Sequence, residues 1–212
     1  MRMPMIALGR QFGSGGREIG KQLAERWEIP CYDRELITLA AQKAELREEL
    51  FAGKDEKAAN PWLFTGVYEG GAGVRKGQPA EDILFEMQSQ VILDLARTAP
   101  CIIAGRCGDF VLRSAGIPVV SLFICAPFAD RVRRRMEREH LSQKAAEELV
   151  RKIDRQRGKY YSSHTGQSWG APETYDFCIN SSLLGLEGTA EWILSCVKAL
   201  EEQIPGSFPT VP

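Results

Sequence analysis

The sequence predicts an α/β domain in which helices cover both faces of a parallel sheet. Short runs made almost entirely of apolar residues recur along the chain, and segments with the apolar spacing of helices separate them. Continuous apolar strands that alternate with helices are typical of a parallel sheet that is buried on both faces. A chain of 212 residues can bury one such core. We therefore expect residues 1–212 to form a single domain with three α/β/α layers and a five-stranded sheet.

The first half of the chain begins with a strand at residues 5–8. A helix is predicted over 17–27, where apolar residues recur at every fourth position. A short strand end follows at 29–33, and a further helix is expected from Arg34. Periodicity is lost over residues 45–78, so we predict a substrate-binding insertion there.

The second half supplies the remaining strands and helices. We expect strands at 101–104, 119–124 and 177–180, and helices at 79–99, 127–140, 143–157 and 186–200. Pro79 suits a first helical turn, Pro100 stops a helix, and Ser142 is a typical N-cap. We predict that residues 142–170 act as a lid and that residues 204–212 form a loose tail.

A glycine-rich run, GRQFGSGGRE, follows the first strand at residues 9–18. A glycine turn between a strand and a helix exposes backbone N–H groups, and the first turn of the helix adds more, so such turns bind phosphate. The predicted phosphate-binding residues are Gly13, Ser14, Gly15, Gly16, Arg17 and Glu18. The alternative is an ordinary glycine-rich connection.

This run departs from the usual phosphate loop, G-x-x-x-x-G-K-[ST], whose Lys contacts the β/γ phosphates and whose hydroxyl binds magnesium. Gly16 stands at the Lys position, and Glu18 stands near the Ser/Thr position. We expect Arg17 to supply the missing charge, because a guanidinium matches phosphate oxygens well. The metal ligands stay open, with Glu18 or Asp33 as candidates through a water molecule.

Polar residues follow two of the other strands. Asp33 comes after the second strand, and Arg106 and Asp109 come after the strand at 101–104. Ligands of such sheets bind at the carboxyl ends of the strands, so we expect these residues to face one crevice with the glycine turn. Arg106 could bind a phosphate or a base carbonyl, and the aspartates could accept from a sugar hydroxyl, a base amino group or metal-bound water. Helix capping and a surface arginine are the alternatives.

Two basic segments lie in the predicted helices that follow. Arg131, Arg134, Arg135 and Arg138 share one helical face by their spacing, and a second cluster occupies 151–157. A run of charge is usually a solvated face, but arginines from two helices could also neutralise a transferring phosphoryl group. The candidate catalytic residues are Arg17, Arg131, Arg155 and Arg157.

The composition argues against several other classes of protein. The 27 basic and 28 acidic residues are interspersed and give a net charge of −1, so we expect no nucleic-acid or membrane-surface partner. No apolar run predicts a membrane span or a signal peptide, and we expect a cytoplasmic protein. The six cysteines are scattered singly, without a C-x-x-C pair, which favours reduced thiols over a metal site. A homodimer stays possible.

The order of six segments carries a family resemblance over most of the chain. These segments are GRQFGSGGREIG, PCYDRELI, IIAGRCGDF, FICAPFADRVRRRMERE, IDRQRGKYY and YDFCINSSLLGLEG. Together they resemble the cytidylate kinase-like family, relatives of bacterial cytidylate kinases. Gly105-Arg106 is similar to the start of the substrate-binding GRD of those kinases, with Cys107 where Asp is usual. Asn180 likewise replaces Asp at the strand end beside the adenine.

This resemblance implies a P-loop NTPase fold and a phosphotransferase activity. The implied reaction is ATP- and Mg²⁺-dependent phosphorylation of a nucleoside monophosphate, CMP or dCMP first. Two alternatives stay open. One is a nucleotide-binding sensor without transfer activity, because the loop lacks its Lys and its hydroxyl. The other is a kinase for a different small acceptor.

Overall fold

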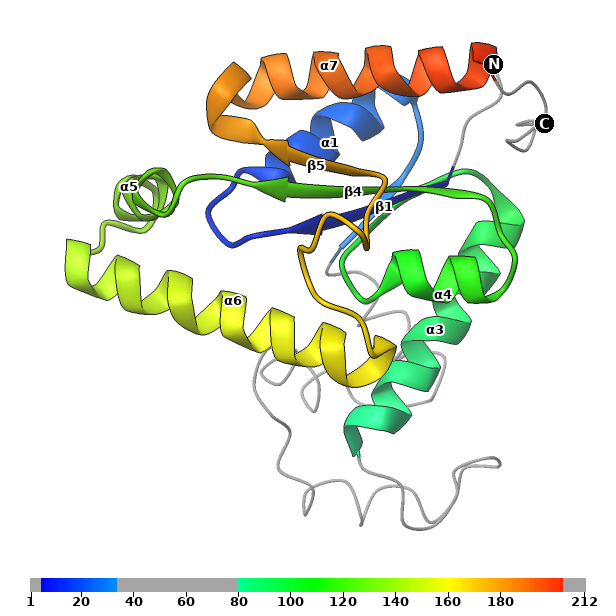
Figure 1. The fold of residues 1–212 in the computed structure, drawn as a ribbon, viewed down its shortest axis with the longest axis horizontal. Coiled ribbons are helices and arrows are strands. Elements are labelled where there is room, and N and C mark those ends of the chain that lie inside the picture. The colour runs from blue at the N-terminus through cyan, green and yellow to red at the C-terminus, as the bar shows by residue number, and fades with distance from the viewer. Residues whose placement is uncertain (1–4, 34–79, 204–212) are drawn as a thin grey trace.

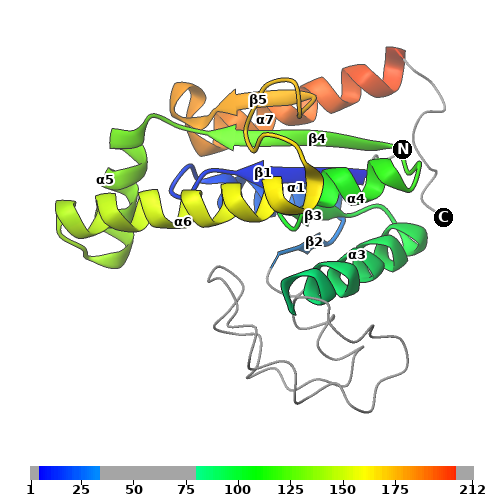
Figure 2. The same cartoon turned by 60° about the horizontal axis from the view of Figure 1, so that its bottom comes forward.

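A fully parallel five-stranded sheet forms the centre of the computed structural model, which describes residues 5–33 and 80–203. The strands are β1 (Met5–Arg10), β2 (Cys31–Tyr32), β3 (Ile102–Ala104), β4 (Val119–Cys125) and β5 (Phe177–Asn180). Their order in the sheet is β2-β3-β1-β4-β5, and every neighbouring pair is parallel. Figure 2 shows this order from β5 at one edge to β2 at the other. The predicted parallel sheet is confirmed.

Helices cover both faces of the sheet. They are α1 (Gly16–Trp27), α3 (Ala80–Thr98), α4 (Gly108–Ser114), α5 (Phe128–Glu139), α6 (Gln143–Thr165) and α7 (Ser181–Gln203). In Figure 1, α1 and α7 lie on one face, while α3, α4 and α6 lie on the other. Helix α5 lies beyond the carboxyl ends of the strands, beside the turn that joins β1 to α1 (Figure 1). The predicted three-layer fold is therefore confirmed.

The central strands bury side chains on both sides, which explains their continuous apolar sequence. On one face, Ile6 and Leu8 of β1 pack in a core with Ile19 of α1 and Ile193 of α7. On the other face, Met5 packs in a second core formed largely by side chains of α3, α4 and β3. The sheet is thus held by two cores, and it fixes the position of its polar carboxyl edge.

Three helices differ from the prediction. Helix α4 was not predicted, because its seven residues are too few to establish a helical period. Helix α6 continues past Arg157 to Thr165, where Tyr161 is buried and Gly166 supplies a left-handed C-cap with a φ of 69°. Helix α7 begins at Ser181 and contains a non-helical residue at Gly185 (φ 71°).

Other predictions are confirmed or fall outside the described residues. The side chain of Ser142 accepts from the N–H of Ala145, as expected of an N-cap. The insertion at 45–78, the helix expected from Arg34 and the tail at 204–212 lie outside the described residues. Within the described ranges, no helix has the length and hydropathy needed to span a membrane.

Two glycines in helices should respond to alanine in opposite directions. A Cβ at Gly108 would lie 2.5 Å from Ile103 Cγ2, whereas one at Gly158 would meet Trp169 at an ordinary 3.6 Å. We expect Gly108→Ala to lower the free energy of unfolding by about 1–3 kcal/mol through overpacking. Gly158→Ala should raise it by up to about 1 kcal/mol through helix propensity. Denaturant unfolding of both variants tests this, and a destabilised Gly158→Ala would contradict it.

Candidate functional site

The turn between β1 and α1 is closed in by other elements at each of its glycines. Gly13 and Gly15 have φ angles of 81° and 80°, which favour glycine. A Cβ at Gly13 would lie 2.7 Å from the carbonyl oxygen of Arg131, and one at Gly15 would collide with the side chain of Leu186. Both positions therefore require glycine for the backbone angle and for space.

Side chains from distant parts of the chain hold the carbonyl oxygens of this turn. Ser181, at the start of α7, donates to the carbonyl oxygen of Ser14 at 2.5 Å. Arg134 of α5 donates to that of Gly13 at 3.3 Å. Ser14 itself is fully buried and donates to the carbonyl oxygen of Gln11 at 2.8 Å. With these oxygens bound to protein donors, an anion at the turn would meet backbone N–H groups.

A buried ion pair fixes the turn to α5 and α6. Arg131 of α5 pairs with Asp154 of α6. The other oxygen of Asp154 accepts from the N–H of Phe12 at 2.7 Å, and Arg131 donates to the carbonyl oxygens of Phe12 at 3.2 Å and Ala126 at 3.0 Å. The structure thus gives the guanidinium of Arg131, a predicted catalytic residue, three polar contacts with protein groups. Breaking such a buried pair leaves an uncompensated charge.

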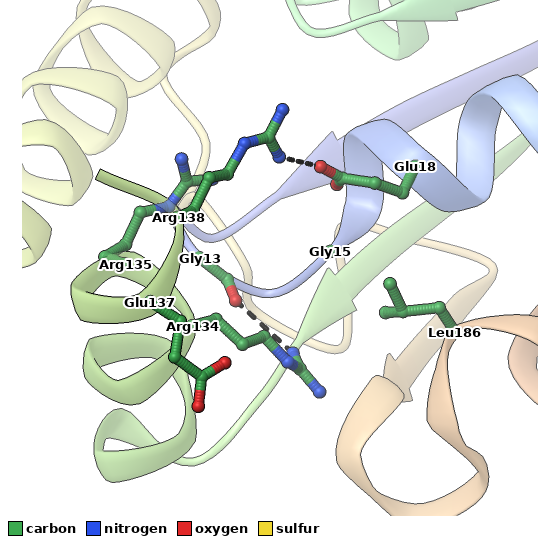
Figure 3. A pocket seen from close by; sticks show the side chains of 8 residues that line it. All are labelled: Gly13, Gly15, Glu18, Arg134, Arg135, Glu137, Arg138 and Leu186. Atoms are coloured by element: carbon green, nitrogen blue, oxygen red, sulfur yellow. Dashed lines mark hydrogen bonds and ion pairs between the residues drawn. The ribbon is translucent and has the colours of Figure 1, made fainter. Parts of the chain in front are cut away.

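A cavity of about 310 Å³ opens on the α5 side of the turn (Figure 3). It is lined by Gly13, Gly15, Glu18, Arg134, Arg135, Glu137, Arg138 and Leu186. Glu18, in the first turn of α1, pairs with Arg138 at one end of the cavity, and Leu186 lies across from α5 (Figure 3). Although burial alone would raise it, the pKa of Glu18 is lowered by its backbone N–H and by Arg138. Glu18 is therefore a carboxylate at neutral pH.

A second cluster of charge lies at the carboxyl ends of β1, β2 and β3, which are neighbours in the sheet. Arg10, the last residue of β1, pairs with Asp33 at 2.8 Å, and Arg17 approaches the other carboxylate oxygen at 3.6 Å. From α6, Arg157 donates to the carbonyl oxygen of Arg10 at 3.2 Å. The structure thus brings Asp33 and Arg157 together beside the glycine turn.

Arg106 joins this cluster from an unusual backbone conformation. Gly105, Arg106 and Cys107 have φ angles of 87°, 58° and 54°, and such left-handed residues are uncommon when they are not glycine. The guanidinium carbon of Arg106 lies 5.9 Å from the centre of the Tyr160 ring. Burial lowers the pKa of Arg106 to about 10, and the like charges of Arg10 and Arg157 act in the same direction. Arg106 is still cationic at neutral pH, and strained residues of this kind cluster at functional sites.

Three predicted site residues have other surroundings. Asp109 is 5% exposed, and its carboxylate accepts from the hydroxyl of Tyr161 at 2.5 Å. Arg155 is exposed on α6, about 200° around the helix from Arg157. The side chain of Asn180 accepts from the N–H of Ser182 at 3.0 Å. The structure does not bring Asp109 or Arg155 to the glycine turn, and their proposed roles stay predictions.

The sequence analysis missed Ser181 and Leu186, which hold and close the turn. A serine directly after a predicted strand was a weak signal for Ser181, and nothing in the sequence marked Leu186. It also missed Arg10, although this arginine lies inside the glycine-rich run.

The described residues 5–33 and 80–203 contain no group of three or more metal-binding side chains. Kinases commonly hold Mg²⁺ with one or two carboxylates and the phosphates of the substrate, so a larger cluster is not required. Glu18 fits this pattern, since its carboxylate lies in the first turn of α1 and lines the cavity beside the glycine turn.

The sequence model of the cytidylate kinase-like family matches residues 5–183, a range that includes the glycine turn, the cluster of charge at the strand ends, α5 and α6. The chain belongs to the cytidylate kinase-like family. The search of curated proteins found no match to the chain.

Solved structures share its fold. An uncharacterized protein from Eubacterium ventriosum is 25% identical with a TM-score of 0.69, and the match covers 93% of this chain and 99% of that one. Shikimate kinase from Acinetobacter baumannii, in complex with shikimate, is 16% identical with a TM-score of 0.50 over 94% and 95% of the two chains. Shikimate kinase from Bacteroides thetaiotaomicron is 14% identical with a TM-score of 0.52 over 92% and 99%. The fold is that of P-loop kinases.

The buried carboxyl of Asp109 should make stability depend on pH. Burial raises its pKa, although the hydrogen bond from Tyr161 opposes this. A raised pKa means that the folded state favours the protonated carboxyl. The stability that this group contributes is fully present below the ordinary pKa of Asp and is lost as pH rises through the raised pKa. Asp109→Asn should therefore raise the Tm at pH 7 by about 2–4 °C and raise it less near pH 4. Thermal unfolding at both pH values tests this, and an equal shift at both would contradict it.

Proposed function

We propose that this member of the cytidylate kinase-like family transfers a phosphoryl group from ATP to a nucleoside monophosphate, with CMP and dCMP as the first candidates. The observation that carries the proposal is the position of the glycine turn between two groups of arginines. One group lines the cavity beside α5, and the other lies at the carboxyl ends of β1, β2 and β3.

The cavity side fits the donor nucleotide. Its volume of about 310 Å³ lies at the lower end of the range for small-molecule sites. Arg134 and Arg138 give it positive charge, and Leu186 gives it an apolar wall. ATP would place its phosphates on the turn from Gly13 to Glu18 and its nucleoside in this cavity.

The cluster of charge at the carboxyl ends of β1, β2 and β3 fits the phosphate of the acceptor. Arg106 lies in the turn after β3, and Arg157 lies in α6. The charge of Arg10 acts on Arg106, and Arg157 donates to the backbone carbonyl oxygen of Arg10. Phosphoryl transfer depends mainly on alignment and on neutralising the charge of the moving group. The acceptor phosphate is itself the nucleophile, so no general base is needed. The segment 142–170, which contains α6 and Arg157, is the proposed lid.

Mg²⁺ would enter with ATP, neutralising phosphate charge. Glu18 is the protein oxygen donor that we assign to Mg²⁺, directly or through water, because its carboxylate lies in the first turn of α1, next to the position of the usual hydroxyl residue, and lines the cavity. Its present partner is Arg138, so metal binding would compete with that ion pair.

The first experiment measures nucleotide products by chromatography, with ATP, Mg²⁺ and a panel of nucleoside monophosphates, and with shikimate as a further acceptor. We expect ADP and a nucleoside diphosphate to form from CMP or dCMP. ATP binding without any product would favour a nucleotide sensor, for which the missing Lys in the turn is the supporting observation. If only another acceptor gives product, that acceptor is the substrate and the proposal of CMP or dCMP is wrong.

Arg106→Lys keeps the positive charge but removes the planar fork that grips two phosphate oxygens. We expect it to lower kcat/KM for the nucleoside monophosphate by about tenfold or more, with little change in the KM for ATP. Arg97→Ala is the control, because Arg97 is two-thirds exposed and lies in the last turn of α3. An unchanged kcat/KM in Arg106→Lys would contradict the proposal that Arg106 binds the acceptor phosphate.

A further inference from the structure

We propose that Arg10 replaces the missing lysine of the phosphate loop and binds the β/γ phosphates of ATP; this inference rests on the proposed function. In the usual motif the first glycine lies six positions before the Lys. Here Arg10 lies six positions before Gly16, which stands at the Lys position. The long cationic residue and the glycine have thus exchanged places within the motif.

The geometry explains why the two changes occur together. A Cβ at Gly16 would lie 2.7 Å from Arg10 Cβ and 3.1 Å from Arg10 Cδ. The side chain of Arg10 therefore occupies the space that the Cβ of any side chain at position 16 would need. An arginine at position 10 excludes a lysine at position 16, and a charge for the phosphates must then come from Arg10 itself.

The guanidinium of Arg10 also points to the correct region. Its Nη2 is 2.8 Å from Asp33 Oδ1, and its Nη1 lies 3.9 Å from the Cβ position at Gly105. The side chain therefore runs from the start of the glycine turn to the turn that carries Arg106. That path joins the proposed donor site to the proposed acceptor site, where the β/γ phosphates must lie for transfer.

Arg10 suits this role better than Arg17, which the sequence alone suggested. The side chain of Arg10 is 12% exposed and that of Arg17 is 50% exposed, although both approach Asp33. The carboxylate of Asp33 holds the planar fork of Arg10 in place before a ligand arrives. Arg106 and Arg157 lie close enough for the charges of the three arginines to act on one another, so cations from β1, α6 and the turn after β3 gather at this edge of the sheet.

The test is calorimetric binding of ATP and of inorganic tripolyphosphate, which has no base, both in the presence of Mg²⁺. We expect Arg10→Ala to weaken both affinities by about tenfold or more, the effect of losing a charge-assisted hydrogen bond. Arg17→Ala removes an equal charge from the same carboxylate and should weaken them less. Arg10→Lys, which keeps the charge and most of the side chain, should stay closer to wild type than Arg10→Ala.

A reciprocal exchange separates ligand binding from a merely structural role. Gly16→Lys alone should lose binding, because the lysine collides with Arg10. The double variant Arg10→Gly, Gly16→Lys restores the G-x-x-x-x-G-K part of the usual motif and should bind ATP more tightly than either Arg10→Ala or Gly16→Lys. Thermal unfolding of each variant, followed by circular dichroism, verifies that binding is measured on folded protein.

The outcomes distinguish this inference from the function on which it rests. Wild-type affinity in Arg10→Ala, a larger loss in Arg17→Ala, or a double variant no better than Gly16→Lys would overturn the role of Arg10 and leave the kinase proposal standing. Failure of the wild-type protein to bind either ligand would overturn the proposed function and this inference together.

Discussion

The close approach of three neighbours to one glycine turn is the constraint on which the rest of the site depends. The backbone of α5 closes Gly13, Leu186 of α7 closes Gly15, and the side chain of Arg10 closes Gly16. None of the three positions has room for a side chain. The neighbouring elements therefore determine the shape of the turn. Helices α5 and α7 can pack against it only because these positions carry no side chain. The cavity beside α5 is a product of the same packing.

Three carboxylates hold the positions of arginines in the site by pairing with them. Each binds an arginine from a distant element, in the pairs Arg131–Asp154, Arg138–Glu18 and Arg10–Asp33. Like charges at such spacing would otherwise repel each other in the partly buried site. The first pair is nearly enclosed and also binds the backbone of the turn, so it helps to fix the conformation of the turn. The other two are more accessible, and a phosphate or a metal ion could compete for one member of each.

Local signals in the sequence predicted the sheet, the glycine turn and the strand-end position of Asp33 and Arg106, because apolar runs and glycine spacing depend on near neighbours. Partners far apart in the sequence could not be read in this way. Nothing near Asp109 indicates that Tyr161 would bind it, and nothing near Arg131 indicates Asp154. Helix α4 was too short to show a period. The opposite directions of Arg155 and Arg157, by contrast, follow from helical geometry alone.

The place of β1 in the sheet has a consequence for how the protein is made. Ile6 pairs with Ile102 on one side and with Val120 on the other, and the turn after β1 is closed by Leu186. The segment that carries the phosphate turn is therefore synthesised long before its neighbours exist. Pairing over such separations is slow and leaves apolar strands exposed in the meantime. The site forms only when the later strands and α7 have emerged, so a nascent chain that stops short of α7 would lack a finished phosphate turn.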